Sequence, residues 1–156
     1  MGELNTSTLG IVGIDCDEYK ENLIFPSLRL YNNSGAWRSF VGFKDDYHDI
    51  RSNRDSSGSP RIDYSKWERK DVNLVIVNTN VTDRVDRMKK LVEGVCGGYR
   101  EVDKDVGVIS FCNKTWSSSY RWICREAGSD AHIYSGDEKS IEDLAGAIGF
   151  LVNIRV

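Results

Sequence analysis

The chain has 156 residues, of which 40% are hydrophobic and 29% charged, with 14 glycines and 2 prolines. This composition predicts one globular domain over residues 1–156 and excludes disordered and collagen-like chains, and no apolar run approaches the roughly 18 residues of a membrane span. The 21 basic and 24 acidic residues leave a net charge of −3. Nucleic-acid binding, which needs clustered Lys and Arg, is therefore not favoured.

The first half of the chain contains three strand-like segments. Leu9–Ile14 is a short continuous apolar run, typical of a strand buried on both faces, and the sequence Asp-Cys-Asp follows it directly. Leu23–Tyr31 and Trp37–Phe43 are rich in aromatic and branched residues, which predicts two more strands. Residues 44–71 have no apolar period and contain a Ser/Gly/Pro-rich stretch, so we expect a surface loop there.

The second half alternates strand and helix patterns. Val72–Val77, Val106–Phe111 and Ala131–Tyr134 predict strands. The first intervening helix has Thr82 as N-cap, an inward face of Val85, Met88, Val92 and Val95, and a stop at Gly97 and Gly98.

Two more helices and a last strand complete the predicted fold. One helix begins at Ser117, turns Tyr120, Ile123, Cys124 and Ala127 inward and ends at Gly128, and the other runs from a capping box at Ser140 through Ile148 to a stop at Gly149. Phe150–Ile154 predicts a closing strand. The alternation predicts an α/β fold, a Rossmann-like and mostly parallel sheet flanked by helices, with a strand/loop insert after the first strand.

The four cysteines, Cys16, Cys96, Cys112 and Cys124, show no metal-binding spacing, and three lie in apolar-periodic segments. Buried thiols are the favoured interpretation. The first residues lack the basic and apolar regions of a signal peptide, which predicts a cytoplasmic protein. Four N-x-[ST] sequons, at Asn5, Asn32, Asn80 and Asn113, keep a secreted protein as the alternative.

Polar side chains follow the predicted strands at their carboxyl ends, where open parallel sheets bind ligands. They are Asp15 and Asp17, Thr79 and Asn80, Asn113 and Lys114, and Asp137, with Glu142 and Asp143 on the helix behind. Carboxylates suit Mg²⁺, whereas a lysine and a hydroxyl can hold phosphate oxygens. Two aspartates two residues apart can serve one substrate as nucleophile and as acid–base group. These residues predict a site for Mg²⁺ and phosphate.

Four short motifs resemble those of the haloacid dehalogenase superfamily of phosphohydrolases. They are a strand ending in Asp15-Cys-Asp17, a strand ending in Thr79, Lys114 before a helix, and Gly136-Asp137 followed by Glu142. Glu18-Tyr19 stands where the family usually has Gly-Thr. The resemblance implies a phosphatase that depends on Mg²⁺ and acts on a phosphorylated substrate, and the composition predicts that it is soluble.

The resemblance also implies a role for each residue. Asp15 would attack phosphorus to form an aspartyl-phosphate, and Asp17 would move the protons. Thr79 and Lys114 would hold the phosphoryl group. Asp15, Asp17 and Asp137 would hold Mg²⁺, with Glu142 or Asp143 in the outer shell, and residues 27–71 would occupy the position of the family's cap.

Two other classes of protein remain open at this point. One is a secreted, glycosylated α+β effector or toxin-like interaction protein that is stapled by two disulfides and has no enzymatic activity. The other, ranked last, is a nuclease of the RNase H-like fold, which needs an acidic residue where Asn78 stands. His48 and His132 have no partner in the sequence that indicates a triad or metal. The four tryptophans are interpreted as packing residues.

Overall fold

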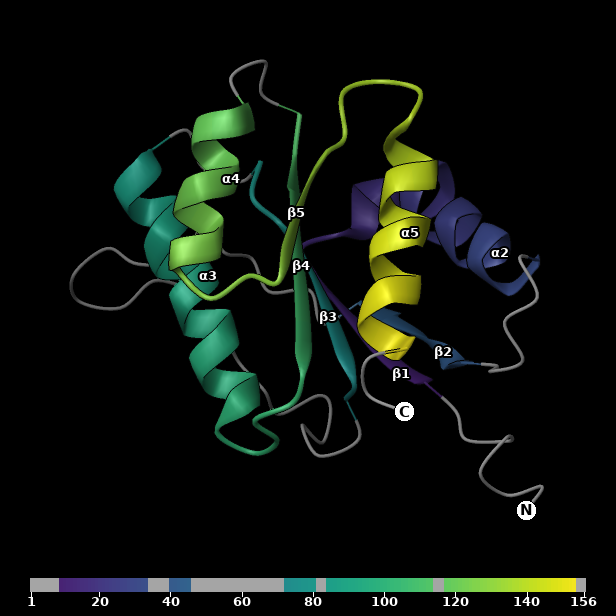
Figure 1. Cartoon of the computed structure of the whole chain (residues 1–156), viewed down its shortest axis with the longest axis horizontal. Helices are drawn as coiled ribbons and strands as arrows, with labels where there is room; N and C mark the ends of the chain where they lie inside the picture. Colours follow the sequence, from purple (N-terminus) through teal and green to yellow (C-terminus); the bar gives the residue numbers. More distant parts are fainter. Residues whose placement is uncertain (1–8, 34–39, 46–71, 81–83, 114–116, 154–156) are drawn as a thin grey trace.

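The computed structural model describes residues 9–33, 40–45, 72–80, 84–113 and 117–153. Five parallel strands form one sheet in the order β2-β1-β3-β4-β5 (Figure 1). The predicted α/β fold with a parallel sheet flanked by helices is thus confirmed. The strands are β1 (Leu9–Ile14), β2 (Phe40–Asp45), β3 (Leu74–Asn78), β4 (Gly107–Cys112) and β5 (Ala131–Tyr134).

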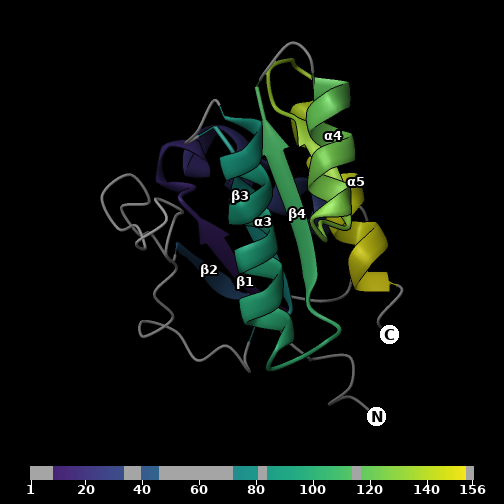
Figure 2. The same ribbon diagram turned by 90° about the vertical axis from the view of Figure 1, so that its left-hand side faces the viewer.

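Helices cover both faces of the sheet, as the two perpendicular views show (Figures 1 and 2). α3 and α4 pack on one face, and α2 and α5 pack together on the other. The helical segments are η1 (Asp17–Tyr19), η2 (Lys20–Ile24), α2 (Phe25–Asn33), α3 (Val85–Arg100), α4 (Ser117–Glu126) and α5 (Ser140–Asn153).

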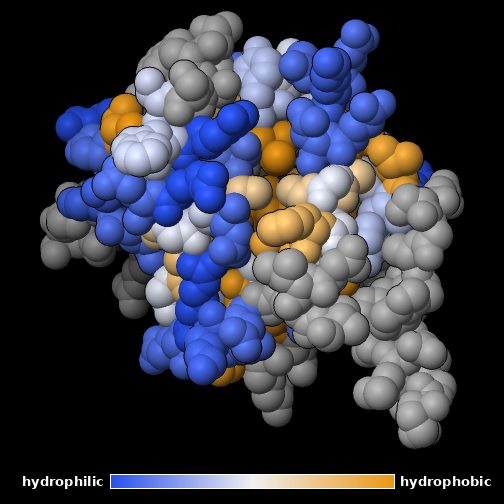
Figure 3. Space-filling view, in the orientation of Figure 1, coloured by the Kyte–Doolittle hydropathy of each residue, from blue (hydrophilic) through white to orange (hydrophobic). Residues whose placement is uncertain are grey.

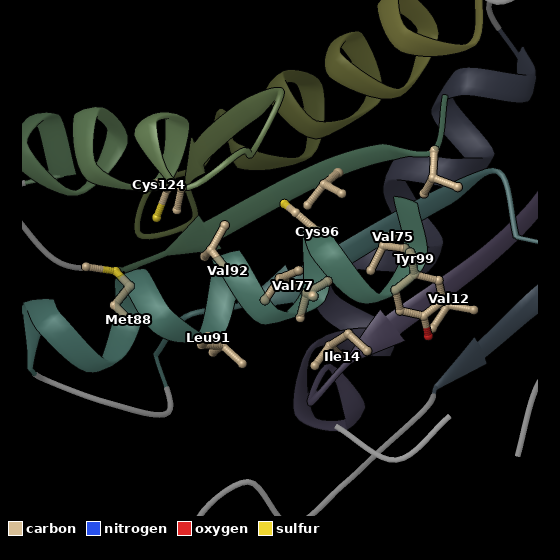
Figure 4. Close-up of a cluster of buried hydrophobic side chains, with 14 of the residues drawn as sticks. Val12, Ile14, Val75, Val77, Met88, Leu91, Val92, Cys96, Tyr99 and Cys124 are labelled. Atoms are coloured by element: carbon tan, nitrogen blue, oxygen red, sulfur yellow. The ribbon is translucent and has the colours of Figure 1, made fainter. Parts of the chain in front are cut away.

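The central strands are apolar along their length because side chains from each strand enter two cores. In β3, Val75 and Val77 pack against α3 and α4, whereas Leu74 and Ile76 point to α2 and α5. Figure 4 shows the first core, in which Val92 and Tyr99 of α3 lie over the sheet. Such burial on both faces explains why the sequence shows short continuous runs of apolar residues here, with no strict alternation of apolar and polar residues.

The prediction of a strand at Leu23–Tyr31 is wrong, since η2 and α2 occupy this segment. The buried residues Leu23, Ile24, Ser27, Leu28 and Tyr31 recur at intervals of three and four, which is a helical period. Pro26 stands where the π-helical turn η2 continues directly into α2. Aromatic and branched composition therefore misled the prediction.

The strand predicted at Trp37–Phe43 exists as β2, which begins at Phe40 and pairs in parallel with β1. Of the insert at 27–71, the structure describes the end of α2 and β2, while 46–71 lie outside the described residues. The assignment of that insert as a cap, like the single domain over 1–156, stays a prediction.

Gly97 and Gly98 do not stop α3, which continues to Arg100, so this prediction is wrong. Tyr99 is fully buried beyond the two glycines. The guanidinium of Arg100 donates hydrogen bonds to the Val106 carbonyl (3.2 Å) and the Gly128 carbonyl (2.7 Å) and pairs with Asp130 (2.9 Å). These contacts hold the last turn of the helix. Of the helix's predicted start, Thr82 lies outside the described residues, and Val85 is exposed and not inward.

α4 ends where the sequence predicted. Gly128 has a φ of 118°, the left-handed conformation that favours glycine. The Gly128 N–H donates to the Arg125 carbonyl and the Ser129 N–H to the Cys124 carbonyl, which together form a Schellman cap. Of the predicted inward residues, Tyr120, Cys124 and Ala127 are buried and Ile123 is half-buried.

The prediction of a last strand at Phe150–Ile154 is wrong, because α5 continues to Asn153 and residue 154 lies outside the described part. Leu144, Ile148 and Leu151 are buried at helical spacing. Gly149 does not end the helix and faces the ring of Tyr31 in α2. The helix begins at Ser140 as expected.

All four cysteines are buried and none forms a disulfide, which confirms the prediction of buried thiols and removes the two-disulfide interaction protein. In the described part of the chain, no helix has the length and apolarity needed to cross a membrane. Trp122 is 70% exposed, which contradicts its interpretation as a packing residue. The other three tryptophans and His48 lie outside the described residues.

Candidate binding site at the carboxyl ends of β1 and β3

The sheet changes direction of growth between β1 and β3. From β1 the chain leads through α2 to β2 on one side, and it continues from β3 through α3 to β4 on the other. In doubly wound sheets of this strand order, ligands bind outside the carboxyl ends of the strands at such a switch point. Ile14 and Val77 are in register there, so the residues that follow each strand come side by side.

Asp15 occupies a strained position directly after β1. Its φ of 56° lies in the left-handed region, which non-glycine residues rarely adopt. The side-chain amide of Asn78, at the end of β3, donates a hydrogen bond of 2.9 Å to the Asp15 carbonyl oxygen. Asn78 therefore stabilises the turn that positions Asp15. A strained residue at a switch point indicates a functional site.

Amide side chains connect the ends of three strands. The Asn78 side-chain oxygen accepts the Asn80 N–H at 2.8 Å, and the Asn80 side-chain oxygen accepts the Asn113 N–H at 2.9 Å, beyond the end of β4. The Asn80 side-chain nitrogen donates to the Tyr19 hydroxyl oxygen at 3.1 Å. We call Asp15, Tyr19, Asn78, Asn80 and Asn113 the amide network.

Tyr19 covers the end of β4 from η1. Its ring meets the ring of the fully buried Phe111 edge to face, with the centroids 5.0 Å apart. Burial, and after it the neighbouring Glu18 carboxylate, raises the pKa of the Tyr19 hydroxyl above its ordinary value. The hydroxyl is therefore protonated at neutral pH and takes part in the network as a neutral group.

Thr79, the predicted phosphate-binding hydroxyl, lies close to Asp15 in the fold but is buried. Its Oγ1 donates a hydrogen bond of 2.8 Å to the Phe111 carbonyl, which also accepts the Thr79 N–H at 3.0 Å. The hydroxyl thus links β3 to β4. Lys114 lies outside the described residues, and so does the side chain of Asp17.

The predicted metal ligands come from distant strands. Asp137 and Glu142 follow β5, which is separated from β1 by β3 and β4. Three strand spacings amount to about 14 Å, too far for Asp15 and Asp137 to hold one ion. Asp137 accepts the Lys139 N–H at 2.9 Å, and Asp137, Glu142 and Asp143 are all exposed. Over the described residues, no group of three His, Cys, Asp or Glu side chains is placed to hold a metal.

A second polar cluster lies inside the sheet, below α4. His132 of β5 is buried, with Nδ1 at 2.7 Å from the Ser110 hydroxyl and Nε2 at 3.3 Å from the Cys112 sulfur. Burial, with a smaller effect of the Arg121 charge, lowers the pKa of His132 to about 4. Burial likewise raises the pKa of Cys124 to about 11. The imidazole is thus a neutral core group.

Sequence reasoning placed Asn80 and Asn113 at the strand ends but gave them no role, and it missed Tyr19 and Asn78. The one signal for them was the Asn-Thr-Asn sequence directly after a buried strand. The predicted phosphate-binding residue was Thr79, whose hydroxyl bonds to the backbone. The amide side chains on either side of it were given no role. Tyr19 carried no signal, because its position depends on the path of η1 over β4.

The strand order defines the class: a doubly wound α/β domain of the flavodoxin-like type. Among solved structures, the chain is similar to a CheY-like response regulator receiver domain protein from Methanospirillum hungatei JF-1, with a TM-score of 0.53, 15% identity and coverage of 96% of this chain and 97% of that chain. It is also similar to a putative pilus assembly protein (cpaE) from Burkholderia thailandensis E264, with a TM-score of 0.55, 11% identity and coverage of 94% and 99%. No protein-family model matches the sequence, and neither does any curated protein.

These comparisons correct the sequence-based identification. The fold is similar to those of a receiver domain protein and a putative pilus assembly protein, so the resemblance to the haloacid dehalogenase superfamily is not supported, and the prediction of an Mg²⁺-dependent phosphomonoester hydrolase is wrong. The secreted effector alternative is not supported either. Short motifs at strand ends recur in unrelated α/β domains, because every parallel sheet places turn and capping residues there.

Proposed function

We propose that this chain is a receiver-like regulatory domain that acts through contact with other proteins and takes up no phosphoryl group at the end of β3. Asn78 is the observation that carries the proposal. A phosphoryl acceptor at the switch point needs a nucleophile such as a carboxylate. An amide is not one, and the Asn78 amide is already bonded to the Asp15 carbonyl and the Asn80 N–H.

The two structural neighbours support a regulatory role. One is a response regulator receiver domain protein and the other a putative pilus assembly protein. Both cover nearly the whole described fold, and neither name denotes a hydrolase. In this chain the ends of β1, β3 and β4 are joined by the amide network, which makes that edge a rigid surface.

The binding of Mg²⁺ and the cellular compartment of the protein remain predictions within this proposal. The Asp15 and Asp17 carboxylates are the residues that would bind Mg²⁺ weakly at the switch point, without Asp137 or Glu142. The four buried thiols support a reducing compartment such as the cytoplasm, where disulfides are rare.

The test is incubation with acetyl phosphate and Mg²⁺, followed by intact-mass measurement, with an active receiver domain as positive control in the same reaction. We expect the wild-type chain to keep its mass. The matched variant Asn78→Asp replaces the amide by a carboxylate of the same size, and we expect it to gain one phosphoryl group. A wild-type chain that gains a phosphoryl group, lost again in Asp15→Asn, contradicts the proposal.

A further inference from the structure

The helices on one face of the sheet carry an excess of positive charge. α3 and α4 lie side by side on that face (Figures 1 and 2), and together they contain six Lys and Arg residues but three Asp and Glu residues. The helical segments of the opposite face, η2, α2 and α5, contain two and three. The space-filling view shows hydrophilic surface over α3 and α4 (Figure 3). The net charge of −3 is thus an average over a basic layer and a more acidic remainder, and the layer decides what binds there.

An exposed tryptophan stands on the outer side of α4. Trp122 is two residues away from both Tyr120 and Cys124, which are buried, and this spacing places it on the opposite side of the helix. The side chain is 70% exposed, more than any other large hydrophobic residue of the described chain. Arg121 and Arg125, one helical turn apart, are exposed next to it. The indole therefore lies in solvent beside two guanidinium groups.

Two lysines of α3 lie at the same height on the sheet. Cys96 of α3 is in contact with Gly128, which follows α4, since an added Cβ at Gly128 would lie 3.0 Å from the Cys96 sulfur. Each comes eleven residues after the start of its helix, so equal distances from the two starts correspond to equal heights. Lys89 is four residues into α3, as Arg121 is into α4, and Lys90 follows it. Lys89 also precedes Cys96 by seven residues and so lies on the side that faces α4.

The four cations are available to a partner. In the described part of the chain, the ion pairs are Arg84–Asp86 and Arg100–Asp130, which leave all four without a carboxylate partner. All four are exposed. Unpaired cations around an exposed indole form a surface for an anionic partner that also carries flat rings. We call this surface the basic face, and its residues are Lys89, Lys90, Arg121, Trp122 and Arg125.

We propose that the basic face binds single-stranded nucleic acid, with one base stacked on the Trp122 indole and the neighbouring phosphates held by the four cations. A base inside a duplex is stacked on both sides, so stacking on the indole selects a single strand. The cations neutralise phosphates, which are the same along any strand, and we therefore expect no strong preference for one sequence. This binding goes beyond the proposed function. It shares no residue with the amide network, so failure of one proposal leaves the other standing.

Two other anionic partners fit the basic face less well. A membrane surface binds a helix through a broad apolar side, whereas Trp122 is the one exposed large hydrophobic residue among the described residues of α4. The carboxylates of an acidic peptide would pair with the cations but leave the indole unused. Nucleic acid is the anionic polymer that uses both the charges and the ring.

The experiment is a titration of a fluorescein-labelled oligothymidylate of about 15 nucleotides with the full chain at about 50 mM salt, followed by fluorescence anisotropy. We expect the wild type to bind with a dissociation constant of about 1–100 μM, and more weakly as the salt concentration rises. Trp122→Ala should weaken binding by about 5- to 150-fold, the effect of losing one stacked base. The matched control is Phe150→Ala, which removes a ring of similar exposure from α5 and should leave the affinity unchanged.

A second pair of variants tests the phosphate contacts. Arg121→Gln with Arg125→Gln should reduce the slope of log K against log salt by about 1.4, because each phosphate contact on a single strand contributes about 0.7. Arg29→Gln with Lys104→Gln removes two exposed cations that lie on α2 and in the loop after α3, and should leave the slope unchanged. Circular dichroism checks that each variant is folded.

Three outcomes would overturn the proposal. The first is a wild type that does not bind up to about 200 μM, which is weaker than ordinary non-specific binding. The second is an equal loss of affinity in a variant and its matched control, because binding would then follow from overall charge or apolarity. The third is tighter binding to polyglutamate, or to vesicles that contain phosphatidylserine, than to the oligonucleotide, which would assign the basic face to an acidic protein or to a membrane.

Discussion

Aromatic side chains lie both at the carboxyl ends of β1 and β3 and beside the outer edge of β5. The two regions differ in what these side chains contact. At the first, Tyr19 packs on Phe111, and its hydroxyl is bonded to Asn80. At the second, Trp122 of α4 and Phe150 of α5 are exposed. A surface whose polar groups bond to one another is complete within one chain, whereas exposed apolar groups gain stability only from a partner.

The largest effect that we expect is on the aromatic pair. Phe111→Ala removes a fully buried ring beneath Tyr19 and should lower the free energy of unfolding by about 3–5 kcal/mol. Trp122→Ala should change it by less than about 0.5 kcal/mol in the monomer, because the indole is exposed. Urea unfolding of both variants measures the difference. Equal losses would show that the two edges are built alike.

Acid should lower the free energy of unfolding through the buried His132 of β5, while the hydrogen bonds of the amide network stay intact. The pKa of His132 is about 4 in the folded chain and about 6.5 when unfolded, so the unfolded chain binds the additional proton between these values. Stability is therefore complete above pH 6.5 and falls as the pH drops toward 4, by about 3 kcal/mol in total at roughly 1.4 kcal/mol per pKa unit.

The groups that face this imidazole are the Ser110 hydroxyl, the Cys112 thiol and the Arg121 guanidinium. His132→Gln cannot take up the proton and serves as the control. Between pH 6.5 and 4.5, the free energy of unfolding should fall less in His132→Gln than in the wild type. The same pH slope in both proteins would assign the acid effect to other groups.

A smaller loss is expected from the network itself. Asn78→Ala removes the donor to the Asp15 carbonyl and the acceptor of the Asn80 N–H and should cost about 2 kcal/mol of unfolding free energy. Amide hydrogen exchange should rise at Asn80 and in the turn after β1. Unchanged exchange there would mean that Asn78 does not stabilise the strained Asp15 turn, and the contrast between the two edges would lose its basis.

Prediction of secondary structure from the sequence succeeded where the residues of one segment alone indicated its structure. Leu9–Ile14 and the strand at Leu74–Asn78 are continuous apolar runs between polar turns, and Gly128 ends α4 by its conformation alone. It failed at Leu23–Tyr31, where β-branched and aromatic composition outweighed a helical spacing of buried residues. It failed again at Phe150, because α5 continues past Gly149 through packing of Leu151 and Val152 that the sequence does not display.

The sequence predicted where the candidate site lies but not which residues form it. The carboxyl ends of β1 and β3 were expected to meet, and the structure puts Ile14 and Val77 in register there and bonds Asn78 to Asp15. Asp137 was expected in the same site, yet the strand order puts β3 and β4 between β1 and β5. Strand order depends on which face each helix crosses, and no local pattern in the sequence displays that choice.

By itself, the sequence determined an α/β domain with buried thiols and polar residues at its strand ends, because apolar runs, helical periods and caps are local properties. Only the tertiary structure decided that Asn78 bonds to Asp15, that Thr79 turns to the backbone and that Asp137 lies apart. Contacts between segments depend on the path of the chain in space, and for that reason the chemistry of this domain is readable only from the folded chain.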